Sequence, residues 1–143
     1  PDKNYVKRLI GLPGATLQMR DKVLYLNGEP QIEPYVQNTD ISGMTVSLPS
    51  MLWQREYLVP GVDPESYRPT RDDWGPIIVP EGHVFVLGDN RDDSEDSRYW
   101  GFVDKRAIKG QPLFVYYSFD PGMVRPFPWL TQIRWDRIGG TIQ

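Results

Sequence analysis

The sequence of 143 residues contains no cysteine and a single histidine, His83. The absence of cysteine excludes a disulfide framework, a thiol nucleophile and a cysteine-bound zinc site. One histidine leaves little scope for a histidine-based catalytic triad or metal centre. We therefore expect any proton transfer to use other side chains, and we expect no metal ion or other cofactor. The absence of cysteine fits the cytoplasm and the bacterial exterior equally well, so it does not fix the compartment.

An excess of positive charge and long apolar runs are also lacking. The formal net charge is -3 and the isoelectric point is about 5.1, so we expect no nucleic-acid partner and weak repulsion from an anionic membrane surface. No apolar run approaches the ~20 residues of a membrane span, and no signal peptide opens the sequence. Because the numbering starts inside a strand-like segment, we expect the chain to be a fragment of a longer protein.

Proline and glycine, by contrast, are plentiful, with 14 and 13 residues scattered along the chain. They leave little room for long helices, so the sequence predicts a mainly β, antiparallel fold. Residues 21–22 are expected to close a hairpin and residues 27–28 to form a further turn. Residues 29–76 show no persistent period, and we interpret them as an irregular second lobe. Strands are expected at 5–10, 16–20, 23–26, 77–79, 83–87 and 112–119, and one helical turn at 104–108.

The C-terminal residues 129–143 are more apolar than a free tail should be. They include Trp129 and Trp135, and tryptophan is enriched where a protein meets the interface of a membrane. These two side chains are therefore candidates for contact with lipid.

Two adjacent cations, Lys7 and Arg8, stand in the first expected strand. Side chains alternate along a strand, so Lys7 shares a face with Tyr5 and Leu9, and both faces are expected to be buried. Burial disfavours a charged amine and lowers its pKa from about 10.4, by up to ~3–5 units at full burial, which would make Lys7 a general base. The alternative is that Lys7 reaches water at the edge of its strand.

The most distinctive segment is a charged loop at residues 88–101, which holds four aspartates, one glutamate and two arginines. Arginines and carboxylates pair through forked hydrogen bonds, so we expect a rigid polar shelf that presents Ser94, with Arg8 bound to one of its carboxylates. The loop does not fit a calcium-binding pattern, because Ser94 stands where glycine is required and Trp100 where glutamate is required. Salt bridges are a simpler explanation of its acids than a glycosidase pair, and a hydrogen bond to Lys7 is a simpler role for Ser94 than that of a nucleophile.

Taken together, residues 5–14, 23–28 and 85–103 closely resemble bacterial type I signal peptidase, of peptidase family S26, and residues 137–140 resemble its C-terminus. The Gly-Asp-Asn-Arg block that begins at Gly88 is the most specific part of the match. The resemblance implies an antiparallel β-sheet catalytic core, here residues 1–14 and 77–143. A smaller, irregular β-rich insertion lobe would comprise residues 15–76.

The resemblance also implies a function. Members are membrane-anchored Ser/Lys-dyad endopeptidases that remove signal peptides from exported preproteins, after small residues, at the outer face of the bacterial cytoplasmic membrane. On matching positions Lys7 would be the general base and Ser94 the residue that orients it, while Tyr5 and Val6 would touch substrate. The supporting residues would be Arg8, Asp89, Asn90, Arg91, Asp96 and Arg98, with Arg8 paired to Asp89 and Asp96 to Arg98.

The family's nucleophile belongs to a Ser-x-Met-x-Pro motif on the N-terminal side of the lysine, and no such motif occurs in this sequence. Ser42-Gly43-Met44 is followed by Thr45 and lies on the wrong side of Lys7. We expect the nucleophile and the membrane span to precede Pro1 in the complete protein, and the chain alone to be inactive.

Two alternatives stay open at this point. One is a non-catalytic, signal-peptidase-like module that binds peptides along a strand edge. The other is a different Ser/Lys protease, such as a self-cleaving repressor or a pilin-processing peptidase of conjugation systems. If core strands are missing, an exposed sheet edge would also favour a dimer of the fragment.

Overall fold

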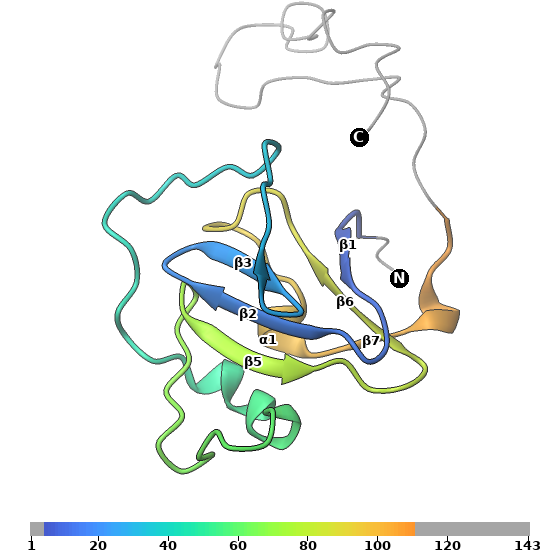
Figure 1. The fold of residues 1–143 in the computed structure, drawn as a ribbon. Helices are drawn as coiled ribbons and strands as arrows, with labels where there is room; N and C mark the ends of the chain where they lie inside the picture. Colours follow the sequence, from blue (N-terminus) through green and yellow to red (C-terminus); the bar gives the residue numbers. More distant parts are fainter. Residues whose placement is uncertain (1–4, 111–143) are drawn as a thin grey trace, which may run out of the picture. The chain divides into compact units, whose positions relative to one another are not determined.

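The computed structural model describes residues 5–110, and most of its regular structure is antiparallel β-sheet (Figure 1). This confirms the prediction of a mainly β fold. One sheet has the strand order β1-β6-β7 and the other has the order β4-β3-β2-β5. The strands are β1 (Arg8–Gly11), β2 (Thr16–Arg20), β3 (Val23–Leu26), β4 (Glu29–Pro30), β5 (Trp74–Ile78), β6 (His83–Leu87) and β7 (Val103–Asp104).

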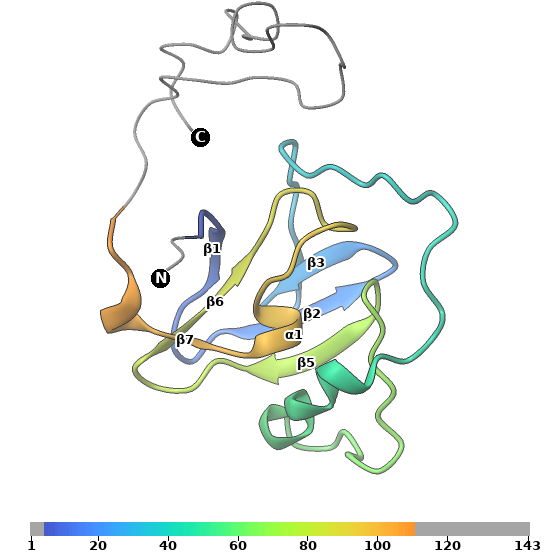
Figure 2. The same ribbon diagram turned by 180° about the vertical axis from the view of Figure 1, so that it is seen from behind.

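In the described part of the chain, three short helices accompany the sheets. They are the 3-10 helix η1 (Pro49–Tyr57), the α-helix α1 (Ser97–Trp100) and the 3-10 helix η2 (Lys105–Ala107). Seen from behind, α1 lies between β6 and β5, and η1 lies beside β5 (Figure 2). Helix η2 confirms the predicted helical turn, whereas η1 and α1 were not predicted. Among residues 5–110, no helix has the length and apolar character needed to cross a bilayer.

The hairpin of β2 and β3 has the predicted boundaries. Its two-residue turn places Asp21 and Lys22 at φ angles of 46° and 65°, the left-handed conformation that matches the twist of a tight hairpin. On β2, Leu17 and Met19 alternate with exposed or half-buried neighbours and are themselves buried. The period-2 pattern therefore directs one face of this hairpin into the core.

Within residues 5–110, the core is one cluster of buried side chains. Phe85 of β6 is fully buried in it, with its ring 5.3 Å from that of Trp74 and 5.9 Å from that of Phe102. Burying an aromatic side chain of this kind stabilises the fold by roughly 1.5–3 kcal/mol. The cluster draws on both predicted parts of the chain, and the division into a catalytic core and an insertion lobe stays a prediction. Its members are Leu17, Met19, Leu24, Met51, Trp74, Ile77, Val79, Phe85 and Leu87.

The first strand differs from the expectation. The structure begins β1 at Arg8 rather than at residue 5, and the side chains of Tyr5, Val6 and Leu9 are 68%, 72% and 49% exposed. The prediction that both faces are buried was therefore wrong. The physical reason is that, within residues 5–110, β1 pairs only with β6 and forms the edge of its sheet.

Two other predictions lie outside the described residues. They are the strand at 112–119 and the apolar segment at 129–143 with Trp129 and Trp135.

Candidate functional site

The pairing of β1 with β6 brings Lys7 and Ser94 into direct contact. Arg8 is opposite Leu87 in this antiparallel pair, so the residue before β1 meets the loop that follows β6. Lys7 Nζ donates a hydrogen bond of 2.6 Å to Ser94 Oγ. The contact is close because residue 88 is glycine: a Cβ atom there would overlap Ser94 Oγ and lie 3.4 Å from Lys7 Nζ. The side chains of the two residues predicted to be catalytic thus meet at a half-buried contact.

Arg8, the first residue of β1, binds Asp89. Arg8 Nε and Nη2 donate to the two carboxylate oxygens of Asp89 at 2.8 and 2.9 Å. This forked geometry is the strongest form of the arginine–carboxylate pair, and the hydrogen bond to Asp89 raises the pKa of Arg8. The guanidinium also lies over the ring of Tyr35, 3.5 Å from its centroid.

The second predicted pair, Asp96 with Arg98, is completely buried. Arg98 Nε and Nη2 each lie 2.8 Å from an oxygen of Asp96, and the two side chains are 1% and 0% exposed. Asp96 also accepts hydrogen bonds from the backbone N–H groups of Gly88, at 3.0 Å, and Arg98, at 3.2 Å. The second of these caps α1. A buried ion pair is tolerated when its remaining hydrogen-bonding groups are satisfied in this way.

Arg91 and Asn90 lie on the side of the loop that faces the segment after β4. Arg91 forms a forked ion pair with Glu33, with distances of 2.8 and 2.7 Å. The backbone of Gln37 bonds to both sides of Asn90, accepting from the N–H of Arg91 at 3.0 Å and donating to the carbonyl of Asp89 at 2.9 Å. Asn90 Oδ1 is buried and has no hydrogen-bond partner within residues 5–110.

Asp92 joins the loop to a third group of charges. Lys22 Nζ lies 2.9 Å from Asp92 Oδ1, and Arg71 Nε lies 3.4 Å from the same oxygen. Arg71 also forks onto Asp72 at 2.8 and 2.9 Å. Burial disfavours ionised Asp92, but the backbone N–H of Asp40 and the ammonium of Lys22 outweigh it and lower its pKa. The pKa of Asp72 is likewise lowered against burial, chiefly by Arg71.

Several of these partners were missed from the sequence. Glu33, Tyr35 and Arg71 lie in the stretch without periodicity, Lys22 lies in the hairpin turn, and no motif marks any of them as a partner of the loop. Lys22 and Arg71 are 70 and 21 residues from Asp92 along the chain, and only the folded structure brings them together. Tyr5 and Val6, predicted to contact substrate, precede Lys7 with exposed side chains, and that role stays a prediction.

Comparison with known proteins places this site in a family. The family described as "Signal peptidase, peptidase S26" matches residues 1–117. The chain belongs to this family. Signal peptidase I of Bacillus licheniformis is 41% identical over 118 residues, which cover 82% of this chain and 53% of that protein. Signal peptidase I of Pseudomonas aeruginosa is 38% identical over 137 residues, which cover 86% of this chain and 47% of that protein. The resemblance predicted from the sequence is thereby confirmed.

The chain spans about half the length of these two curated relatives. Among solved structures, a crystal structure of a signal peptidase I from Enterococcus faecalis is 37% identical in sequence. The match covers 73% of this chain and 78% of that one, with a TM-score of 0.44.

The contact of Lys7 with Ser94 is the arrangement in this site that could transfer a proton. An amine within hydrogen-bond reach of a hydroxyl can hold or pass a proton, provided that it is neutral when it accepts. The arginines around this contact form ion pairs with carboxylates of the protein, so their charges are already neutralised. Within residues 5–110, no group of three or more His, Asp or Glu side chains could hold a metal ion.

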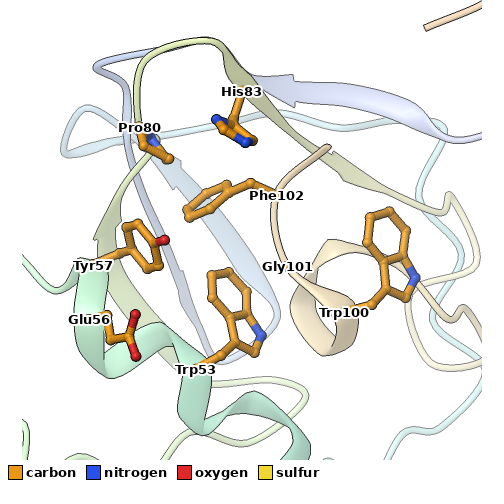
Figure 3. Close-up of a pocket in the computed structure, with 8 residues that line it drawn as sticks. All are labelled: Trp53, Glu56, Tyr57, Pro80, His83, Trp100, Gly101 and Phe102. Carbon is orange, nitrogen blue, oxygen red and sulfur yellow. The ribbon is translucent and has the colours of Figure 1, made fainter. Parts of the chain in front are cut away.

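A separate pocket of about 250 Å³ lies at the other end of β6, where His83 begins that strand (Figure 3). Its aromatic rings pack on one another edge to face, with Phe102 5.0 Å from Trp53 and 4.9 Å from Tyr57. The indole N–H of Trp53 donates to the carbonyl of Arg98 at 3.0 Å. The pocket therefore adjoins the scaffold of the charged loop without including Lys7 or Ser94. Its lining consists of Trp53, Glu56, Tyr57, Pro80, His83, Trp100, Gly101 and Phe102.

Proposed function

We propose that this chain is the lysine-bearing part of a Ser/Lys-dyad signal peptidase. The observation that carries the proposal is the hydrogen bond of 2.6 Å between Lys7 Nζ and Ser94 Oγ. Membership of the family and the position of Lys7 beside exposed chain support it. The nucleophilic serine would come from a Ser-x-Met-x-Pro segment that precedes Pro1 in the complete protein.

The reaction follows from these roles. Neutral Lys7 takes the proton of the nucleophilic serine as its oxygen attacks the scissile carbonyl, and a tetrahedral intermediate forms. The ammonium of Lys7 then gives that proton to the leaving amine as the peptide bond breaks, which leaves an ester to the serine. In the second half, Lys7 accepts a proton from water and the hydroxide attacks the ester. The ammonium of Lys7 returns the proton to the serine oxygen as the ester bond breaks and the carboxyl product leaves. Ser94 acts on this cycle by fixing the direction of the Lys7 side chain.

The substrates we propose are exported preproteins, cut after small residues at the outer face of the bacterial cytoplasmic membrane. Tyr5 and Val6 would line the path of the signal peptide on the open side of Lys7. Trp129 and Trp135 would contact the lipid interface. We propose no nucleic-acid partner. We also propose that the fragment can form a dimer through the open edge of its sheet.

The test uses the complete protein, with the reading frame upstream of Pro1 included. Lys7→Ala should abolish cleavage of a preprotein, because the proposed reaction uses no other base, while the circular-dichroism spectrum stays that of the parent. Lys105→Ala, which changes an exposed lysine away from the site, should cleave at the parent rate. Substantial cleavage by Lys7→Ala would rule out the dyad.

Ser94→Ala gives a graded version of the same test. It should lower kcat on the order of 10²-fold without abolishing turnover, since the lysine remains but is less well directed. Complete loss together with covalent labelling of Ser94 by an acylating inhibitor would instead make Ser94 the nucleophile. If the upstream reading frame encodes no serine segment and no cleavage occurs, the proposal fails and the alternative of a peptide-binding module is favoured.

A further inference from the structure

We infer that Glu33 is a positioning residue for the Lys7–Ser94 pair and acts through Arg91 and the carbonyl of Gly88. This inference rests on the proposed function, because it concerns the same pair. It assigns a role in catalysis to the segment after β4, which carries no recognisable motif. Figure 1 shows this cyan segment beside the yellow loop that follows β6.

The first step of the argument is the burial of the ion pair between Glu33 and Arg91. The side chains of Arg91 and Glu33 are 4% and 8% exposed, although each belongs to a connecting segment. The Glu33 carboxylate accepts both guanidinium N–H bonds and also the hydroxyl of Tyr35, at 2.9 Å. A buried carboxylate with three hydrogen bonds has one well-defined position, so it fixes that of the guanidinium.

The second step is what Arg91 does with its remaining donor. Its Nε donates to the carbonyl oxygen of Gly88 at 3.1 Å. The N–H of Gly88 donates to Asp96 at 3.0 Å. Both polar groups of the Gly88 backbone are therefore held from within the loop, one by each of its arginine–carboxylate pairs. Without Glu33, Arg91 would be a buried cation with no charged partner, and it would move toward water.

The third step connects Gly88 to the reacting amine. The Cα of Gly88 lies against Ser94 Oγ so closely that no Cβ fits between them. A rotation of the Gly88 peptide unit therefore moves the surface on which Ser94 and Lys7 meet. The neighbouring ring of Tyr35 reinforces this arrangement, since it bonds to Glu33 and also lies under Arg8, which holds Asp89. The segment from Glu33 to Gln37 thus supports the loop at Gly88, Asp89 and Arg91.

A positioning role predicts a specific kinetic signature. In the complete protein, Glu33→Gln should lower kcat on the order of 10- to 100-fold and leave KM within about twofold, because the substrate surface at residues 5–6 is unchanged. Glu33→Asp, which keeps the charge, should recover part of the loss. The matched control is Glu29→Gln, an exposed glutamate of β4 in the same connection, which should match the parent. An unchanged kcat in Glu33→Gln, or a fall in kcat that Glu33→Asp does not recover, would overturn the inference.

A second readout uses the 143-residue chain and needs no activity. With lysine labelled at Cε, the Lys7 resonance is assigned from the Lys7→Met variant. Ser94→Ala should change the chemical shift of the Lys7 Cε resonance, and Glu33→Gln should change it in the same direction. Glu29→Gln should leave this chemical shift unchanged. If Glu33→Gln leaves the resonance in place, Glu33 does not position Lys7. If it moves but Lys7→Ala still cleaves, the proposed function fails while the structural link stands.

Discussion

The two sides of the Lys7–Ser94 contact are built differently. On the serine side, the loop after β6 is held by buried ion pairs to Asp96, Glu33 and Asp92 and by the cap of α1. On the lysine side, Tyr5 and Val6 are largely exposed, and β1 has one described partner strand. The hydroxyl therefore has a fixed position, while the amine stands at an open edge. Under the proposed function, the open side is where a polypeptide substrate would approach the amine.

The largest expected loss of stability comes from breaking the buried ion pair between Asp96 and Arg98. Asp96→Ala leaves Arg98 as a buried unpaired cation and removes the cap of α1, so the free energy of unfolding should fall by ~3–5 kcal/mol. Urea denaturation of the 143-residue chain measures it. The matched control is Asp104→Ala, which breaks the solvent-exposed pair with Arg106 and should have a much smaller effect. Similar losses in the two variants would show that burial of the pair is not what holds the loop.

A smaller effect is expected where the two sides touch. In Gly88→Ala the new methyl group must displace Ser94, which should cost ~1–3 kcal/mol and separate Lys7 from the hydroxyl. The unfolding free energy and the Lys7 Cε resonance report the two consequences. Gly110→Ala is the control, because a Cβ at Gly110 meets no atom within 4 Å. A Gly88→Ala chain of parental stability and parental resonance would contradict the close approach.

Acid should lower the free energy of unfolding by protonating Asp92 and Asp72, which help to hold the loop that carries Ser94. Their pKa values are lowered in the folded protein, so their stabilising contribution is present above the unfolded value of about 3.9 and is lost as pH falls through the folded pKa. Urea midpoints should therefore drop below about pH 4. Asp92→Asn should reduce this slope as well as the stability at pH 7, whereas Asp93→Asn, at the exposed neighbouring position, should keep the slope. An unchanged slope in Asp92→Asn would mean that other carboxylates dominate acid unfolding.

The smallest change in stability is expected in the exposed segment before Lys7. Val6→Ala should change the unfolding free energy by no more than about 0.5 kcal/mol, since the side chain is mostly in water already. Val79→Ala, the same substitution at a buried position, should cost on the order of 1–3 kcal/mol. Equal values for the two valines would mean that the segment before Lys7 is covered in solution.

The parts of the fold that the sequence predicted are those set by neighbouring residues. The hairpin of β2 and β3 and the strand β6 follow from alternation and from turn residues a few positions away. Helix η1 could not be predicted, because a 3-10 helix in a proline-interrupted stretch has no 3.6-residue period. The four residues of α1 are too few for any periodicity. The burial of residues 5–9 was predicted wrongly because it depends on a second neighbouring strand, which alternation along one strand does not reveal.

The candidate site divides in the same way. Lys7, Ser94 and the residues of the loop were found because they occur in contiguous, specific motifs. Glu33 was not found, because its partner Arg91 is 58 residues away and a glutamate in an irregular segment is ordinarily a solvated surface residue. Such partners become visible only when burial is known.

The long separation of the site's partners also bears on how the protein folds. The hairpin of β2 and β3 joins neighbours in the chain, whereas the contacts of Arg8 with Asp89 and of Lys7 with Ser94 span 81 and 87 residues. Closing loops of that length slows folding, so we expect the hairpin to form first and the β1–β6 pairing late. Pulse-labelled hydrogen exchange would then protect the amides of β2 before those of β1. During synthesis, Lys7 leaves the ribosome long before Ser94 exists, and the amine acquires its partner only as the final pairing of the sheet is made.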